Sequence, residues 1–447
     1  MTILWTDALV FFLVLIMLVL GFYLRGKEHL RRPIGKVTAS RVGMVSLVIL
    51  LFFVMIGLLD SIHFKPENDK SNEIISLLDR WTTSIRQQQE KTYSSPFSAY
   101  SYSKEHITAD NGSQLWTYPR LKYGGAHLKN PDIEKPLDIM QKAGIGFVKG
   151  TGLFVLVFLL SWVFFKVRHQ SLLKGAAAKP VWMAIFIIIS GSYMLIELSG
   201  YYHVLGTDKV GEDVFYQAIK SIRTGLVIGS LTTLIMLPLA IIFGILAGFF
   251  RGWVDDVIQY IYTTLNSIPS VLLIAASILM VQVYMANNED QFTSLVVRAD
   301  MRLLFLCLIL GVTSWTGLCR LLRAETLKLR EMEYVQAAQA LGVRRRMILM
   351  RHILPNVMHI VLISVVLDFS SLVLAEAVLS YINIGVDPTT YSWGNMINGA
   401  RLEMAREPIV WWSLMASFLF MFTLVLAANI FADTVRDAFD PRRAEND

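Results

Sequence analysis

The chain alternates between long apolar stretches and short polar ones over most of its 447 residues. A helix needs about 20 apolar residues to cross the hydrocarbon core of a bilayer. Nine stretches approach or exceed that length: residues 4–24, 41–59, 146–166, 181–199, 219–249, 257–283, 301–320, 356–382 and 409–431. The fifth and eighth are longer than a bilayer requires, and we expect those helices to tilt or kink. The pattern predicts an all-α polytopic membrane protein with about nine transmembrane helices.

Basic residues gather in the short loops between these stretches. Three loops carry most of them: residues 25–41, with Arg25 and Lys27, residues 166–179, with Lys174, and residues 320–351. Short loops rich in Lys and Arg remain in the cytoplasm. With nine spans, this rule places the N-terminus outside and the C-terminus in the cytoplasm. The net charge of +6 is explained by this bias, and we expect no nucleic-acid partner.

Residues 60–145 form the one long polar segment. They include eleven Lys and Arg and eleven Asp and Glu, so the segment is neutral. It is too long for its charges to set the topology, and the parity of the spans places it on the extracytoplasmic side. We expect an amphipathic helix near residues 72–88 and turns at 110–112 and 124–125. The simplest interpretation is a small cap packed on the membrane helices.

A second polar segment, between the seventh and eighth stretches, has the features of a docking helix. Glu333 stands where a helix begins, and an acidic side chain stabilises the positive end of the helix dipole. Tyr334, Ala338 and Leu341 recur at helical spacing as a narrow apolar stripe. Gly342 suits the left-handed position that follows a helix. A helix of this kind fits a groove in another protein. On spacing alone, an ordinary basic loop is an equally good interpretation.

Motifs of an ATP-hydrolysing enzyme are missing from the sequence. It contains no GxxxxGK[ST] phosphate-binding loop and no LSGGQ signature of an ABC ATPase. Its eight histidines are scattered, and its two cysteines, Cys307 and Cys319, share one predicted helix on which they cannot bridge. We therefore expect no enzymatic activity, no metal site and no cofactor in this chain.

Seven motifs follow one another between His203 and Arg442. They are Gly206-Thr207-Asp208 with Gly211 and Asp213-Val214; Gly252-Trp253-Val254-Asp255; Ser267-Ile268-Pro269-Ser270; residues 333–355 with Gln336-Ala337-Ala338, Gly342 and Leu354-Pro355, extended by Asn356; Glu376 with Leu379-Ser380 and Gly385-Val386; Ser392-Trp393-Gly394-Asn395-Met396; and Asp437-Ala438-Phe439-Asp440-Pro441-Arg442. In this order they resemble the C-type permease subunit of oligopeptide and dipeptide ABC importers. The resemblance covers about 240 residues, more than half of the chain.

The resemblance implies a type I ABC-importer permease core at residues 200–447, with a cytoplasmic coupling loop at 321–355 that engages the ATPase subunits through a helix at 331–346. Before the core we expect N-terminal transmembrane helices (1–59), the extracytoplasmic insert (60–145) and an additional transmembrane helix pair (146–199). A bacterial inner-membrane protein of this kind would work with a second homologous permease, two ABC ATPase subunits that bind ATP, and an extracytoplasmic substrate-binding protein. Its cargo would be peptides or a similar small polar solute. The insert would then be either the cap or a docking surface for the binding protein, and we favour the cap.

The resemblance also implies which residues couple the chain to the ATPases. They are Glu333, Tyr334, Gln336, Ala337, Ala338, Leu341, Gly342, Arg344, Leu354 and Pro355. Two residues depart from the family pattern. Gln336 replaces the leading glutamate of the coupling motif, and Glu212 replaces an arginine at an outer position that we expect to be exposed. The enlarged N-terminal half is a third departure, and the sequence assigns it no role.

Ionisable groups inside predicted spans mark candidate pathway residues. Asp368 and Glu376 lie in the eighth stretch, which borders the pathway if the fold follows the family. Each could line the pathway or form a hydrogen bond between helices. For Glu376 we favour the hydrogen bond, and for Asp368 we favour neither interpretation. Gly225 with Gly229, and Gly244 with Gly248, have the spacing of close helix packing.

Three other functions fit parts of the sequence. The chain could be a permease of the same family for another solute, such as a nickel chelate. It could be a secondary carrier, although no clear inverted repeats support that. It could also be a membrane sensor with the insert as its receptor, which would leave the docking segment unexplained.

Overall fold

The computed structural model describes residues 4–24, 28–65, 74–108, 114–167, 177–288 and 294–439. The chain forms two compact units: residues 35–224 and 391–427 make the first, and residues 3–34, 225–390 and 428–447 make the second. The boundary falls inside three helices, α2 (Glu28–Ala39), α8 (Val214–Phe250) and α17 (Trp412–Phe439). Some residues singled out in the sequence lie outside the described part: Arg25, Lys27, Lys174 and Asp440-Pro441-Arg442.

The predicted all-α membrane class is confirmed. Seven helices in the described ranges are long and apolar enough to cross a membrane: Arg41–Asp60, Pro131–Phe164, Ala178–Ser199, Val214–Phe250, Ser270–Asn287, Arg345–Tyr381 and Trp412–Phe439. Each overlaps one of the predicted stretches. The first stretch forms α1 (Trp5–Leu24), a 20-residue helix that is apolar over Trp5–Val19. The seventh stretch does not give a helix of this kind, because α11 (Leu295–Ser314) carries three charged residues in its first half.

Two predicted stretches are interrupted by helix boundaries. α9 (Trp253–Ser267) ends before Pro269, and α10 (Ser270–Asn287) begins after it. Ile268 adopts extended backbone, with φ −91° and ψ 130°, because the residue before a proline is driven out of the helical region. α12 (Thr316–Arg330) begins after Trp315, where α11 ends. The predicted spans 257–283 and 301–320 are therefore wrong as single helices.

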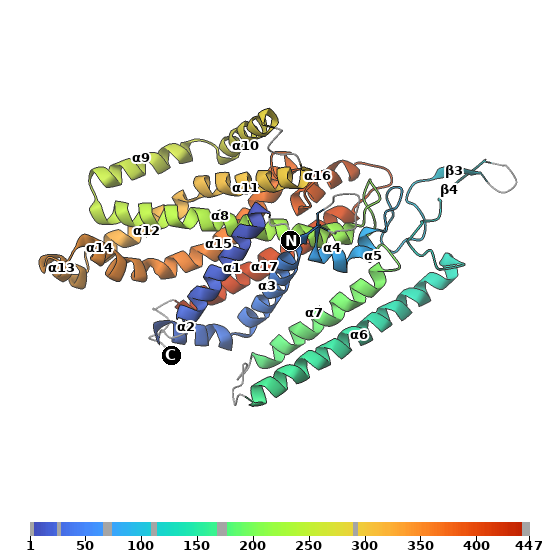
Figure 1. Ribbon diagram of the computed structural model, residues 1–447, viewed down its shortest axis with the longest axis horizontal. Helices are drawn as coiled ribbons and strands as arrows, with labels where there is room; N and C mark the ends of the chain where they lie inside the picture. Colours follow the sequence, from blue (N-terminus) through green and yellow to red (C-terminus); the bar gives the residue numbers. More distant parts are fainter. Residues whose placement is uncertain are drawn as a thin grey trace. The chain divides into compact units, whose positions relative to one another are not determined.

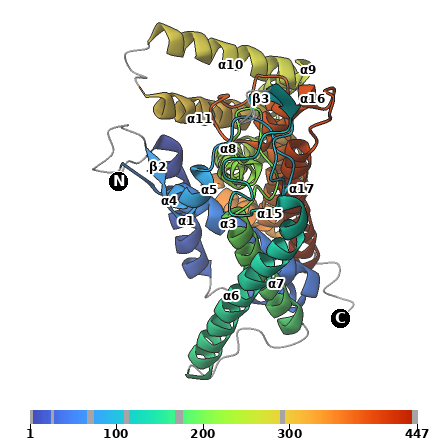
Figure 2. The same ribbon diagram turned by 90° about the vertical axis from the view of Figure 1, so that its right-hand side faces the viewer.

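The additional helix pair of the first unit is a hairpin. α6 (Pro131–Val167) and α7 (Ala178–Ser199) lie side by side in both views (Figures 1 and 2), and α7 also packs on α3 (Arg41–Asp60). Gly146 and Gly150 of α6 permit the close approach, because a Cβ at either position would lie 2.7 Å from a Cα atom of α7. α6 begins at Pro131, well before residue 146, and has 37 residues. It is therefore about 55 Å long, against about 30 Å for the hydrocarbon core.

The insert contains short elements rather than one helix. β1 (His63–Phe64) pairs with β2 (Ile75–Ser76), and α4 (Leu77–Trp81) and α5 (Thr83–Arg86) follow. The helix expected near residues 72–88 is wrong because Ser76 caps the start of α4 and Thr82, with ψ 18°, separates α4 from α5. β3 (Glu105–Thr108) and β4 (Gln114–Thr117) form a hairpin that extends away from the helices of this unit (Figure 1). The turn expected at 110–112 lies outside the described residues.

One apolar cluster joins α8 to α9, α12 and the residues that follow α12 in the second unit. Gly244 and Gly248 of α8 pack against α12, where a Cβ would lie 2.8 Å from the Cβ of Leu322 and 2.6 Å from the Cβ of Thr326. The close helix packing predicted for these two glycines is confirmed. α10 and α11 also lie side by side (Figure 2).

Two further contacts fix α1, near the N-terminus, and a helix from the C-terminal part of the chain to their neighbours. α1 packs on α11 in the second unit, and both the hydroxyl and the backbone N–H of Thr6 donate to the carboxylate of Asp300. In the first unit, α16 (Trp393–Glu403) is capped by Ser392, whose hydroxyl accepts the N–H of Asn395 at 3.0 Å. The indole N–H of Trp393 donates to the backbone oxygen of Ala218 at 3.1 Å, which fixes α16 to α8.

Candidate functional site

The coupling segment, which we define as residues 331–355, contains two short helices. α13 covers Glu333–Ala340 and α14 covers Arg345–Ile348, so one helix over 331–346 is wrong. Gly342 causes the break, because its φ of +72° ends α13 as predicted. The N–H of Gly342 donates to Gln339 and the N–H of Val343 donates to Ala338, each at 3.0 Å. This pair of bonds is the Schellman arrangement that terminates helices at glycine.

The coupling segment enters the next membrane helix without a loop. α14 is followed by one turn of π-helix, Leu349–Ile353, and then by α15 (Leu354–Tyr381). Pro355 lies in the first turn of α15, directly after the π-helical turn, and because it has no N–H it cannot donate to a carbonyl of that turn. The end of the coupling segment is therefore continuous with a membrane-length helix.

The inner face of α13 is fixed to the core of the second unit. Val335 is fully buried and Ala338 nearly so, in the same cluster as Ile348 and Ile353. Burying one valine stabilises such a contact by about 1.5–3 kcal/mol. The predicted apolar stripe is wrong as one face. Ala338 points into the core, whereas Tyr334 and Leu341 are exposed, Leu341 to 83%.

The outer face of the coupling segment is open. The predicted coupling residues that are exposed are Glu333, Tyr334, Gln336, Ala337, Leu341, Gly342, Arg344 and Pro355, while Leu354 is half-buried. They combine two small residues and two apolar side chains with charges of both signs, and Met347 and Met350 are exposed nearby. Exposed apolar side chains clustered among charged residues are typical of a surface that another protein covers.

Polar contacts hold this outer face in place. The Gln336 amide donates to the backbone oxygen of Glu331 at 3.2 Å, so the residue that replaces the family's glutamate bonds within its own chain. The Glu331 carboxylate pairs with Arg251 at 2.6 Å. Asn356 donates to the Tyr334 hydroxyl at 3.0 Å and links α13 to the start of α15.

α12 is clamped to its neighbours just before the coupling segment. The Arg323 guanidinium binds both carboxylate oxygens of Asp255, at 2.6 and 2.7 Å. These charged hydrogen bonds lower the pKa of Asp255. Arg330 donates to the backbone oxygen of Phe249 at 2.8 Å. The Gly252–Asp255 motif thus ties α9 and the end of α8 to α12.

The two candidate pathway residues lie in different surroundings on α15. Glu376 is buried in the second unit, and the Ser380 hydroxyl donates to it at 2.7 Å. This bond lies within α15, so the hydrogen bond between helices that we favour for Glu376 stays a prediction. Asp368 is half-buried, and none of the described residues donates a hydrogen bond to its carboxylate. The structure does not bring the two carboxylates together at one site.

The insert is joined to the core by a buried charge cluster that the sequence did not reveal. His203 is fully buried, with Nδ1 2.8 Å from the Asp213 carboxylate and Nε2 3.4 Å from the Glu90 carboxylate. Burial alone would lower the pKa of His203, but the two carboxylates raise it to about 9. Burial would raise the pKa of Glu90, but hydrogen bonds from His203 and from the backbone N–H groups of residues 122–124 lower it to about 2. Asp213 also accepts the N–H of Phe215 and starts α8.

A second cluster lies where α3 meets α8. The Lys220 ammonium lies 2.6 Å from Asp60, at the end of α3, and 2.9 Å from Asp79, on α4. Burial would raise the pKa of Asp79, but Lys220 and hydrogen bonds from Ser76 and Tyr216 lower it to about 2. The two clusters make the insert an integral part of the first unit, as the cap interpretation expects.

Glu212 is not the exposed outer residue that we expected. It is half-buried, and its carboxylate accepts hydrogen bonds from the Tyr391 hydroxyl at 2.6 Å and from the Gln217 amide at 2.9 Å. Its negative charge serves contacts inside the first unit. The sequence offered Asp213 and Glu212 as parts of a motif, but nothing in it pointed to Glu90 or Lys220.

Comparison with known proteins identifies related chains. Residues 240–445 match the model of the binding-protein-dependent transport system inner membrane component family. The dipeptide transport system permease protein DppC of Lactococcus lactis is 30% identical over 55% of this chain and 65% of its own length. The glutathione transport system permease protein GsiD of Pectobacterium atrosepticum is 30% identical over 54% and 73%, respectively.

One more relative and one solved structure also match parts of this chain. The oligopeptide transport system permease protein OppC of Haemophilus influenzae is 30% identical over 54% of this chain and 71% of its own length. An inward-facing structure of the MetNI methionine ABC transporter matches 49% of this chain and 96% of that chain, with 14% identity and a TM-score of 0.35. That structural likeness is too slight to carry an argument.

Proposed function

Because this chain belongs to the family of binding-protein-dependent transport system inner membrane components, which are permease subunits of ABC importers, we propose that it carries peptides or a similar small polar solute across the membrane. Relatives named for dipeptides, oligopeptides and glutathione support this choice. We propose that the energy comes from two separate ABC ATPase subunits, and that a second, homologous permease completes the channel.

The outer face of the coupling segment carries the proposed contact with an ATPase. Val335 and Ala338 fix one side of α13 to the core, while Leu341 and Ala337 project from the other. A rigidly seated helix transmits a push better than a loose loop, because motion of a partner cannot be absorbed locally. α15 continues directly from the segment, so a push would reach a membrane helix.

The topology supports a cytoplasmic position for the coupling segment. Basic residues cluster in and near it, as expected for short cytoplasmic loops. α8 is a single membrane-length helix, so the residues that precede it and those that follow it lie on opposite sides of the bilayer. Glu90 and His203 then lie on the extracytoplasmic side, in a bacterial inner membrane, and the C-terminus lies inside.

Purification of the tagged protein from its native membrane in mild detergent tests this proposal. We expect two P-loop ATPases and a second permease in stoichiometric amounts. Ala337→Arg should release the ATPases and keep the second permease, because the added side chain fills the contact face. Ala126→Arg, at an exposed alanine of the insert, is the matched control and should release neither. Recovery of the chain alone in several detergents would favour a sensor or a secondary carrier instead.

A further inference from the structure

The β3–β4 hairpin leaves an unusual amount of apolar surface open. Four residue pairs hold its strands together, from Glu105 with Thr117 to Thr108 with Gln114. Leu115 is 54% exposed, Trp116 57% and Tyr118 47%, and the Trp116 ring contacts His106 on the paired strand at 4.4 Å. A two-stranded hairpin is marginally stable in water on its own. Clustered exposed apolar side chains on such an element indicate a surface that a partner covers.

The surface around the hairpin is positively charged. Residues 87–108 and 114–130 contain five Lys and Arg against two Asp and Glu. Glu90 is buried in the cluster described above, and Glu105 is paired with Lys91 at 2.6 Å. Lys91, Lys104 and Lys122 are exposed, and Lys104 lies 5.4 Å from the centre of the Tyr118 ring. The described part of this surface therefore complements an acidic partner.

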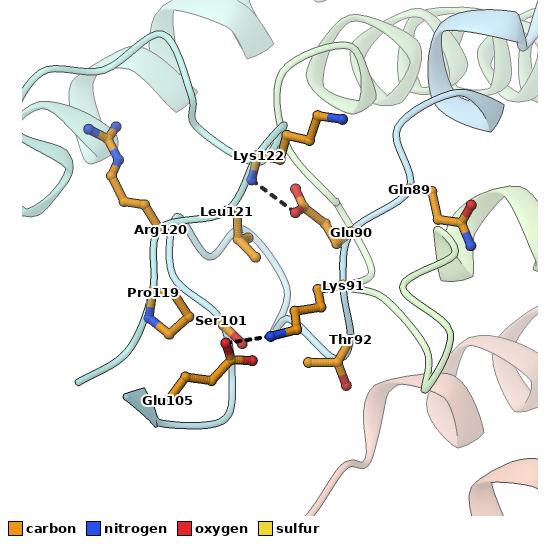
Figure 3. A pocket seen from close by; sticks show the side chains of 10 residues that line it. All are labelled: Gln89, Glu90, Lys91, Thr92, Ser101, Glu105, Pro119, Arg120, Leu121 and Lys122. Atoms are coloured by element: carbon orange, nitrogen blue, oxygen red, sulfur yellow. Dashed lines mark hydrogen bonds and ion pairs between the residues drawn. The ribbon is translucent and has the colours of Figure 1, made fainter. Parts of the chain in front are cut away.

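A pocket of about 180 Å³ opens at the base of the hairpin. Glu105, the first residue of β3, and residues 119–122, just after β4, line it together with residues 89–92 and Ser101 (Figure 3). In Figure 3, the ammonium of Lys91 reaches Glu105 across the pocket. The volume suits one side chain, and the charged walls suit a polar one. Protein interfaces commonly seat a partner's anchor side chain in such a pocket.

We propose that the β3–β4 hairpin and the pocket at its base dock an acidic face of the extracytoplasmic substrate-binding protein. This inference rests on the proposed function, which requires such a protein and places the insert on its side of the membrane. Trp116 and Tyr118 are two residues apart and so face the same side of the chain; they supply the apolar centre of the contact, and Lys104 and Lys122 supply its basic rim. The hairpin lies outside the part of the chain that matches the family model, so it adds a contact to the shared permease core.

Matched substitutions in the insert separate this surface from its surroundings. Trp116→Ala and Lys104→Glu change the proposed contact. Trp81→Ala and Arg80→Glu change an equally exposed tryptophan and cation on α4. The full importer, in nanodiscs, would be titrated with the substrate-binding protein that stimulates the ATPase activity of the wild-type importer. Affinity and rates would be measured by surface plasmon resonance at two salt concentrations.

We expect both hairpin variants to raise the Kd at least about tenfold and both control variants to leave it unchanged. Trp116→Ala should act on the dissociation rate, and Lys104→Glu should act on the association rate, less so at high salt. Basal ATP hydrolysis and the subunit composition should stay as in the wild type, because neither residue contacts the coupling segment.

Three outcomes would overturn the inference. The first is an unchanged Kd in the hairpin variants when the binding protein still stimulates ATP hydrolysis; the proposed function would then stand without this docking site. The second is loss of the second permease from the complex, which would make the surface a contact between permeases. The third is an effect of Lys104→Glu that vanishes when phosphatidylglycerol is left out of the nanodiscs, which would make it a lipid contact. If the proposed function itself were wrong, the purification from the native membrane would already yield the chain without ATPase subunits.

Discussion

Replacing His203 with glutamine would test the charge cluster that joins the insert to α8. The imidazole is fully buried between two carboxylates, which raise its pKa to about 9 against the lowering effect of burial. A rise from 6.5 to about 9 corresponds to about 3 kcal/mol of stability while the ring is charged. Glutamine keeps a side chain that can donate a hydrogen bond but removes the charge. We therefore expect the first unit to lose about 3 kcal/mol at neutral pH, within the range for breaking a buried ion pair.

The pH dependence has a definite sign. Since the pKa of His203 is raised, its contribution is complete below pH 6.5 and is lost as the pH rises through about 9. Since the pKa of Glu90 is lowered to about 2, its contribution is present above pH 4.5 and is lost as the pH falls through about 2. The cluster therefore stabilises the fold most between these two windows. The wild type should lose thermal stability between pH 6.5 and 9 more steeply than His203→Gln does.

Hydrogen exchange read by mass spectrometry gives a local measure of the same effect. The backbone N–H groups of residues 122–124 all donate to the Glu90 carboxylate, at 2.7 to 3.1 Å. They should exchange faster in His203→Gln than in the wild type, and faster in the wild type at about pH 9 than at pH 6.5 after correction for intrinsic rates. His106→Gln, on the exposed hairpin, is the control and should change neither. Equal protection of residues 122–124 in the wild type and His203→Gln would refute the reasoning.

The second unit offers further tests. Gly342→Asp should abolish ATP-linked uptake of a labelled peptide while the membrane fraction keeps its normal content, because it places a carboxylate on the proposed contact face where a side chain at φ +72° meets no neighbour and costs at most about 1–2 kcal/mol; normal uptake would rule out a coupling role. Ala337→Arg should have the same effect on uptake but change the thermal stability by less than about 0.5 kcal/mol. Arg323→Ala should lower stability by about 1.5–3 kcal/mol through loss of the charged hydrogen bonds to Asp255, and an unchanged melting temperature would contradict this. Gly244→Val should cost about 1–3 kcal/mol, since a Cβ there already lies 2.8 Å from α12; an unaltered melting temperature would mean that α12 can shift.

Sequence patterns were most reliable where the cause is local. The apolar stretches predicted the membrane helices because the length of a span depends only on bilayer thickness. Gly342 was placed correctly because a left-handed helix end is decided by the residue at that position. The buried face of α13 was predicted wrongly, because the spacing that joins Tyr334 to Leu341 does not show which side of the helix meets the core. Val335, one residue away from Tyr334, is the residue that is buried.

Contacts between distant parts of the chain could not be predicted. Glu90 and His203 are 113 residues apart, and a single acidic residue in a polar segment carries no sign of its partner. The same holds for Glu212, whose burial depends on Tyr391, 179 residues later. The prediction of one helix near residues 72–88 was wrong because it gave the amphipathic pattern more weight than the local effect of Ser76 and Asp79. Their reciprocal capping bonds start a new helix within that stretch.

The separation of Asp60 from Lys220 along the chain, 160 residues, constrains how the protein is made. In the proposed topology, the insert is synthesised and exported before the lysine and histidine that neutralise its buried carboxylates exist. Unpaired carboxylates do not stay buried, so the insert cannot close over them at that stage. The insert must stay incompletely folded while α6 and α7 enter the membrane, and its folding is completed only after His203 and the start of α8 have been synthesised. A ribosome-stalled chain that ends before His203 should therefore present an insert that proteases cut readily, and the same segment excised as a soluble domain should not fold.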